Sequence, residues 1–109
     1  MTKVELFDTD LRETSLVFKA LSHPARLAIL KYLAEAKVCI SGDISNELPL
    51  SRTTVNQHLK ELKDAGLIKG EIDGSRVNYC LNNNTIRQVK KLLDQFLDEI
   101  NCCDKSNCE

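Results

Sequence analysis

The sequence predicts a mostly helical domain with one β-hairpin, arranged as a winged helix-turn-helix that pairs with a second copy through its terminal helices. Three patterns predict this: an amphipathic helix over 51–65, a hairpin over 68–81 and a long apolar stripe over 86–100. The 109 residues suit one domain. We expect a flexible arm at 1–10, the folded domain at 11–100 and a cysteine-containing tail at 101–109.

Three helices are expected before the amphipathic one. The first covers 11–21, with apolar positions Leu11, Val17, Phe18 and Leu21. The second follows from Ser22 as its cap, with Pro24 in the first turn and an apolar face of Leu27, Leu30 and Leu33. Next to its start, His23 is expected to make a local hydrogen bond and Arg26 to lie at the surface or on a phosphate.

A short third helix is expected over 41–48, capped by Ser41, with Ile44 and Leu48 facing inward. A short helix, a tight connection and a second helix with a polar outer face together predict a helix-turn-helix.

The helix over 51–65 has two different faces. Ser51 is a good N-cap, and Gly66 stands where a helix ends in a left-handed residue. One face is the apolar stripe Val55, Leu59 and Leu62. The other carries groups that can hydrogen-bond base edges and phosphates: Arg52, Thr53, Thr54, Asn56, Gln57, His58 and Lys60. An ordinary solvated face is the alternative, and the neighbouring elements favour recognition of DNA.

The hairpin is expected to turn at Asp73-Gly74 in a type I′ turn. With a two-residue turn, Glu71 would face Arg76 and Ile68 would face Tyr79. A hairpin directly after a recognition helix is a wing, whose Arg76 could reach backbone phosphate or the minor groove. The alternative is a hairpin that only covers the core.

The C-terminal helix follows three asparagines, 82–84, which are expected to form a loop and a cap; Thr85 with Gln88 could form a capping box. Its apolar stripe is close to a heptad seam: Ile86, Val89, Leu93, Phe96, Leu97 and Ile100. Such a stripe packs on its own core, on a symmetry mate, or on both. We favour a homodimer, because helix-turn-helix proteins usually read two half-sites with two-fold symmetry.

Charge is unevenly distributed along the chain. The formal net charge of −1 excludes a uniformly basic nucleic-acid binder. Residues 51–63 nevertheless hold three basic side chains and one acidic, whereas the part from Asp94 onward holds five acidic and one basic. The acidic end is therefore not expected to contact DNA.

The chain has neither a stretch apolar enough to span a membrane nor a secretion signal, so we expect a cytoplasmic protein. In that compartment the five cysteines are expected to be ligands or reactive thiols rather than structural disulfides. Of these, Cys80 is expected to be buried.

Three stretches carry a resemblance to a known family: LSHPARLAIL (21–30), LSRTTVNQHLKELKDAGLI (50–68) and GEIDGSRVNYCL (70–81). With the order of elements over residues 11–100, they resemble the ArsR/SmtB family of metal-responsive repressors. The resemblance implies a dimer that binds double-stranded operator DNA, represses its own operon and leaves DNA when a toxic metal or metalloid binds. His58 matches a histidine of the family's recognition helix, which implies a role in helix structure and approach to DNA.

The positions of the cysteines indicate which effector the chain would bind. Arsenic-responsive members resembling this chain have Cys-Val-Cys where this sequence has Cys39-Ile40-Ser41, which leaves one thiolate. A zinc-type site on the last helix needs Asp/His pairs, and residues 83–100 contain no histidine. The tail instead looks like the C-terminal arsenite site of some family members. Its expected ligands are Cys102, Cys103 and Cys108, with Cys39 as a further candidate.

Three thiolates match the three bonds of trivalent arsenic or antimony, the expected effector. The alternatives are a redox-sensing repressor, in which Cys102 or Cys103 forms a disulfide with Cys108, and a cadmium- or lead-sensing repressor. An enzyme is not expected, because the chain has no Cys-x5-Arg, no Cys-x-x-Cys and no pairing of nucleophile and base.

Overall fold

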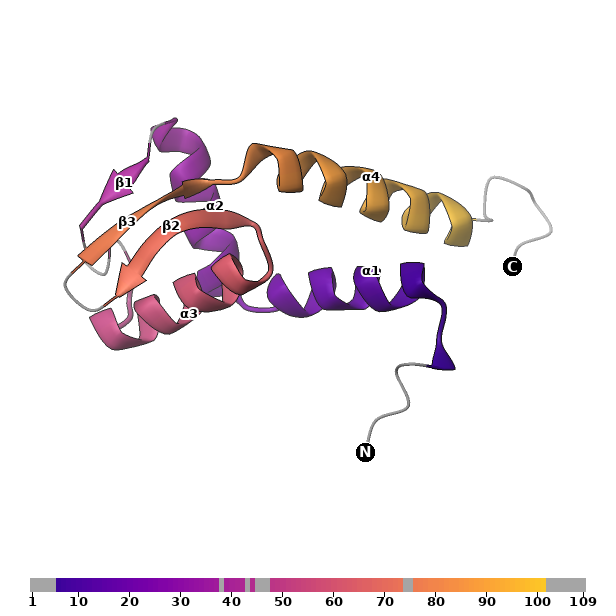
Figure 1. Ribbon diagram of the computed structural model, residues 1–109, viewed down its shortest axis with the longest axis horizontal. Coiled ribbons are helices and arrows are strands. Elements are labelled where there is room, and N and C mark those ends of the chain that lie inside the picture. Colours follow the sequence, from indigo (N-terminus) through magenta and orange to yellow (C-terminus); the bar gives the residue numbers. More distant parts are fainter. Residues whose placement is uncertain (1–5, 38, 43, 45–47, 74–75, 102–109) are drawn as a thin grey trace.

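The computed structural model describes residues 6–37, 39–42, 44, 48–73 and 76–101. This part contains four helices and a small antiparallel sheet of strand order β1-β3-β2. The elements are α1 (Thr9–Ala20), α2 (Pro24–Ala36), β1 (Ile40–Ser41), α3 (Arg52–Asp64), β2 (Ile68–Asp73), β3 (Arg76–Leu81) and α4 (Asn83–Ile100). Figure 1 shows α2, α3 and the sheet together in one body, from which α1 and α4 extend side by side. The predicted winged helix-turn-helix is confirmed.

The core lies between α2, α3 and the hairpin. Val55, Leu59 and Leu62 of α3 are at most 1% exposed, which confirms the predicted apolar stripe. They belong to one cluster with the buried residues Ile29, Leu33, Leu67, Ile68 and Tyr79. Burial of an aliphatic side chain contributes about 1.5–3 kcal/mol, so this cluster fixes the position of α3 on the sheet.

The start of α2 differs from the prediction. Its N-cap is His23, whose Nδ1 accepts a hydrogen bond from the Ala25 N–H at 3.0 Å. The hydroxyl of Ser22 instead donates to the carbonyl of Lys19, at the end of α1. The buried face is Ala25, Ile29 and Leu33, and Leu27 is 47% exposed. The prediction was wrong about Leu27 because this helix has apolar residues on several faces, and the sequence alone does not show which face packs against the core.

Three further boundaries differ from the prediction. The first helix begins at Thr9 rather than Leu11. Ser41, the predicted cap of a helix over 41–48, lies in β1 opposite Asn78; positions 43 and 45–47 of that helix lie outside the described residues. The last helix begins at Asn83, inside the stretch that was expected to be a loop. Its cap is Asn82, whose side chain accepts from the Thr85 N–H; this confirms a cap among the three asparagines, whereas the predicted capping box of Thr85 with Gln88 does not start the helix.

The hairpin register was predicted wrongly. The structure pairs Asp73 with Arg76, Glu71 with Asn78 and Ile68 with Leu81, so the residues between the strand ends are 74 and 75. A slide of this kind keeps every side chain on its face of the sheet, so the alternation of apolar residues cannot reveal it. The observed register places Gly70 opposite Tyr79.

Among the described residues of the hairpin, Gly70 is the position that requires glycine. Its φ is +131°, and a Cβ there would overlap the Asn78 carbonyl oxygen and the Tyr79 Cα. Gly66 also has a positive φ, +83°, but a Cβ there would meet only the Thr85 side chain, at 3.6 Å. Alanine at Gly66 would have an unfavourable backbone conformation only, whereas alanine at Gly70 would also overlap the neighbouring strand. Comparing the two variants therefore separates the two contributions to stability.

We expect Gly70→Ala to lower the free energy of unfolding by about 3 kcal/mol or more, because a strained conformation and a backbone overlap add. Gly66→Ala, which carries the conformational cost alone, should lose about 1–2 kcal/mol. Urea denaturation followed by circular dichroism measures both. Equal losses in the two variants would contradict the collision at Gly70.

Candidate nucleic-acid interface

The polar face of α3 is built by its N-cap and its buried stripe. Ser51 Oγ accepts the Thr54 N–H at 3.3 Å and lies 3.1 Å from the Thr54 hydroxyl, so both side chains belong to the cap. The cap starts the helix in the orientation that turns Val55, Leu59 and Leu62 inward. Of the predicted DNA-contacting residues on this helix, four are exposed (Arg52, Thr53, Gln57 and Lys60), and three are half-buried (Thr54, Asn56 and His58).

A cluster of His23, Arg26 and His58 joins α2 to α3. Arg26 Nε donates to His58 Nδ1 at 3.2 Å, and the two imidazole rings lie 4.2 Å apart. Burial first, and then the charges of His23 and Arg26, lower the pKa of His58, while Glu61 opposes them. A lowered pKa favours the neutral imidazole, which is the form that can accept from Arg26.

The same arginine also closes α1. Arg26 Nη1 donates to the carbonyl oxygens of Lys19 at 3.1 Å and Ala20 at 3.2 Å, the last residues of that helix. Arg26 is therefore a half-buried connector between helices, a role that the expectation of a surface or phosphate contact did not include. The local hydrogen bond predicted for His23 is confirmed. The pattern His-Pro-Ala-Arg at the start of a helix could have indicated this joint, but its partner His58 is 32 residues away.

The wing follows α3 directly. Arg76 begins β3 at the tip of the hairpin, opposite Asp73; its side chain is outside the described part of the structure. Figure 1 shows α3 lying along the hairpin, so the helix and the wing belong to one body. A recognition helix with an adjacent wing is a common docking unit for double-stranded DNA.

The five cysteines fall into two groups. Cys102, Cys103 and Cys108, the predicted effector ligands, lie outside the described residues. Cys39 and Cys80 form a disulfide, with a Cα–Cα separation of 4.3 Å. This corrects the expectation of unpaired thiols. It also corrects the expectation that Cys80 is buried, because Cys80 is half-buried and Cys39 is exposed.

The pairing was missed because β1, only two residues long, has no pattern that the sequence could show. Once β1 is placed opposite β3, its register of Ile40 with Tyr79 continues to Cys39 with Cys80. Among the described residues, no three His, Cys, Asp or Glu side chains gather in a way that could hold a metal ion.

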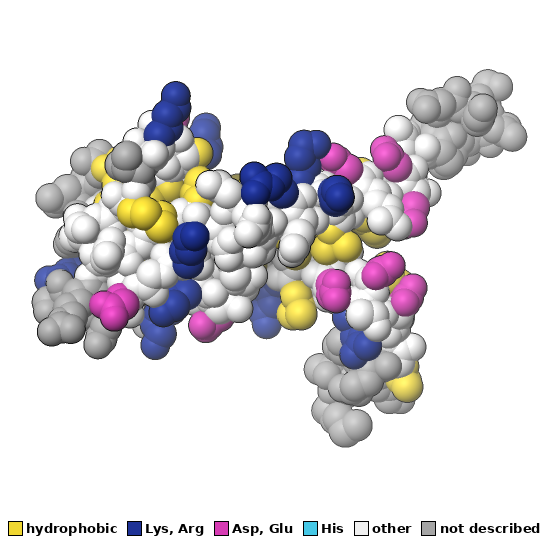
Figure 2. All heavy atoms as spheres, turned by 45° about the horizontal axis from the view of Figure 1, so that its top comes forward, with side chains coloured by type: hydrophobic (Ala, Val, Ile, Leu, Met, Phe, Trp, Pro, Cys, Tyr) yellow, Lys and Arg dark blue, Asp and Glu magenta, His cyan; other side chains and the backbone are white. Residues whose placement is uncertain are grey.

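The outer face of α1 and α4 is apolar and exposed. Leu16 is 63% exposed, Leu97 52% and Ile100 58%, and Phe18 packs edge-on against Phe96 with ring centroids 5.9 Å apart. Figure 2 shows hydrophobic side chains between the two helices and acidic side chains gathered towards their outer ends. No described helix combines the length and the apolar character that crossing a membrane requires.

This fold and the polar face of α3 define a DNA-binding regulator of the helix-turn-helix class. Residues 21–71 match the family model described as a helix-turn-helix domain. The chain is 32% identical over 94 residues to the arsenical resistance operon repressor of Staphylococcus xylosus, covering 86% of each chain. It is 33% identical over 99 residues to the cadmium resistance transcriptional regulatory protein CadC of Listeria innocua, covering 90% of this chain and 82% of that one.

A solved structure, the ArsR-like transcriptional regulator from Rhodococcus sp. RHA1, matches with a TM-score of 0.61 and 26% identity, over 80% of this chain and 81% of that one. The chain belongs to the ArsR/SmtB family. It is a transcriptional repressor of that type and not an enzyme, as the sequence predicted.

Proposed function

We propose that the chain binds double-stranded operator DNA as a homodimer and that trivalent arsenic or antimony releases it by binding Cys102, Cys103 and Cys108. The observation that carries the DNA-binding part is the division of α3 into a fully buried stripe and an exposed polar face. The residues that contact DNA in this proposal are Arg52, Thr53, Thr54, Asn56, Gln57, His58 and Lys60, with Arg76 from the wing. His58 acts mainly through its contact with Arg26, which holds the helix at its angle to α2.

The exposed apolar face of α1 and α4 supports the homodimer. No residue of α4 is buried in the single chain, although the helix carries the apolar stripe that runs from Ile86 to Ile100. A second copy would cover Leu97 and Ile100. Two-fold pairing would then present two α3 helices to half-sites about 34 Å apart, one turn of DNA.

The position of the tail supports its role as the effector site. The tail follows α4 directly, since Asn101 is the C-cap of that helix. Thiolates select soft, thiophilic centres, and three of them complete the coordination of trivalent arsenic. In the proposed dimer, binding of the effector to the tail changes how the α4 helices pack, and a coupling of about 1–3 kcal/mol lowers operator affinity about 5- to 150-fold.

The test measures fluorescence anisotropy of a labelled palindromic operator duplex, with the reduced protein and increasing arsenite. We expect arsenite to release the native repressor. Cys102→Ser, Cys103→Ser and Cys108→Ser should each keep operator binding and lose the release.

Cys80→Ser is the matched control and should respond as the native protein does, whereas loss of release in Cys39→Ser would add Cys39 to the ligand set. Normal release in all three tail variants would contradict the tail site. Release by cadmium but not arsenite would favour the alternative that the CadC relative suggests.

A further inference from the structure

Cys39, the residue directly before β1, lies opposite Cys80 of the neighbouring antiparallel strand β3. Their Cα atoms are 4.3 Å apart, close to the ~4.5 Å of a directly opposed pair without hydrogen bonds. Side chains of such a pair leave the same face of the sheet and meet. The fold therefore holds the two sulfur atoms together through the backbone, independently of the tail cysteines.

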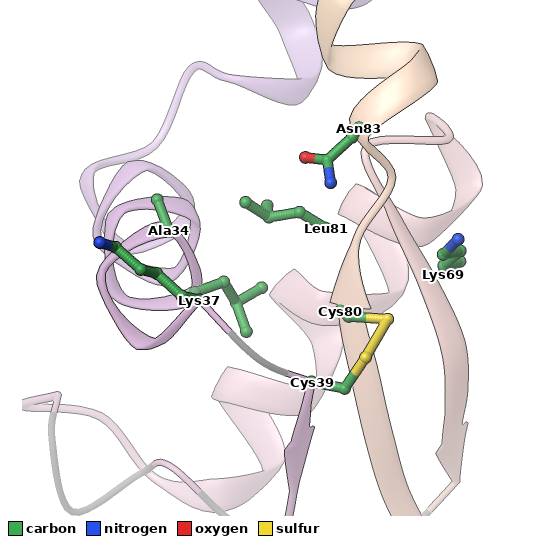
Figure 3. Close-up of a pocket in the computed structure, with 8 residues that line it drawn as sticks. Ala34, Lys37, Cys39, Lys69, Cys80, Leu81 and Asn83 are labelled. Atoms are coloured by element: carbon green, nitrogen blue, oxygen red, sulfur yellow. A yellow bond between two sulfur atoms is a disulfide. The ribbon is translucent and has the colours of Figure 1, made fainter.

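The pair lies at the edge of an open hollow of about 560 Å³. Figure 3 shows both sulfur atoms together with the other residues that line it, among them Lys37, Lys69 and Asn83. Cys39 is exposed and Cys80 half-buried, so a small molecule can reach the sulfur atoms. Lys69 is paired with Cys80 on the opposite strand, β2, and a neighbouring ammonium group favours the nucleophilic thiolate.

We infer that Cys39 and Cys80 form a redox-active dithiol, which hydrogen peroxide or an organic hydroperoxide oxidises to the disulfide. One thiolate attacks a peroxide oxygen, the O–O bond breaks, and a sulfenic acid and an alcohol or water form. The second thiolate then attacks the sulfenic sulfur, so that the S–S bond forms and the S–O oxygen leaves as water. The two sulfur atoms lose two electrons, which the peroxide gains, and a cellular dithiol reverses the reaction.

The bond connects the end of α2 to the root of the wing. Its two cysteines are 41 positions apart, and Cys80 comes just before the α4 cap Asn82. The tip of the hairpin, where Asp73 faces Arg76, lies at the other end of β3. Oxidation therefore closes a large loop of the DNA-reading body, and it stabilises the folded repressor because the unfolded chain loses freedom.

The test uses the full chain with Cys102, Cys103 and Cys108 replaced by serine, so that only the sheet cysteines can react. After reduction and treatment with hydrogen peroxide, we expect a mass lower by two hydrogens and a peptide that joins Cys39 to Cys80. The thermal midpoint of the treated protein should lie about 5 °C or more above that of the reduced protein.

Cys39→Ser and Cys80→Ser in the same background should show neither change. Both cysteines remaining open to alkylation after peroxide, or a thermal midpoint that oxidation does not raise, would overturn the inference. These measurements need neither operator DNA nor arsenite, so their outcome does not depend on whether the proposed function is correct.

Discussion

Gln57→Ala should lower the affinity for the cognate operator about 5- to 150-fold and leave the affinity for unrelated DNA nearly unchanged. Gln57 is exposed on the polar face of α3, where an amide can form a bidentate pair with a base edge worth about 1–3 kcal/mol of discrimination. Its side chain takes no part in the buried stripe, so the fold should be retained. Anisotropy titrations of cognate and scrambled duplexes at fixed salt measure both affinities.

Lys60→Ala on the same face distinguishes sequence-specific contacts with bases from electrostatic contacts with phosphate groups. A lysine on phosphate weakens binding to all sequences alike and reduces the salt dependence by about one released ion. The matched control is Lys90→Ala on α4, whose ammonium group pairs with Asp94 at 2.7 Å and lies off α3. If Gln57→Ala weakened cognate and scrambled DNA equally, a base contact by this residue would be excluded.

The second large effect is expected at the apolar seam. Leu97→Glu should weaken self-association by about 100-fold, because two-fold symmetry places two carboxylates in one apolar interface, where unpaired charge is costly. Leu97 is 52% exposed in the single chain, so the monomer should still fold. Sedimentation equilibrium measures the association. Binding to a two-half-site operator should fall with it, since only the dimer contacts both halves.

Gln88→Glu is the control for this charge, because Gln88 is exposed and lies off the stripe of α4. It should leave association and operator binding within about twofold of the native protein. An unchanged dimer in Leu97→Glu would show that another surface of the chain forms the interface.

Sequence patterns predicted the elements that depend on periodicity and missed those that depend on contacts between distant residues. Val55, Leu59 and Leu62 recur at the spacing of one helical face, and that face proved to be buried. The hairpin register was hidden, because sliding the turn by one position leaves Ile68 and Tyr79 on the same side of the sheet. The close backbone approach at Gly70, which does distinguish the registers, appears only in three dimensions.

The candidate site shows the same division. The polar residues of α3 could be selected from the sequence, since their helix and its cap are local. The disulfide of Cys39 with Cys80 and the hydrogen bond of Arg26 to His58 could not, because each joins segments more than 30 positions apart. The assignment of effector ligands to Cys102, Cys103 and Cys108 stays a prediction, as does the division into arm, domain and tail.

Arg26 has a consequence for the spacing of DNA half-sites. One guanidinium group holds the last turn of α1 and the middle of α3 at once, through the carbonyl groups of Lys19 and Ala20 and the imidazole of His58. In the proposed dimer, α1 belongs to the pairing surface and α3 to the reading surface. The distance between the two α3 helices is therefore set inside each subunit, and Arg26 is one of the contacts through which a tilt of the paired α1 and α4 helices would move α3.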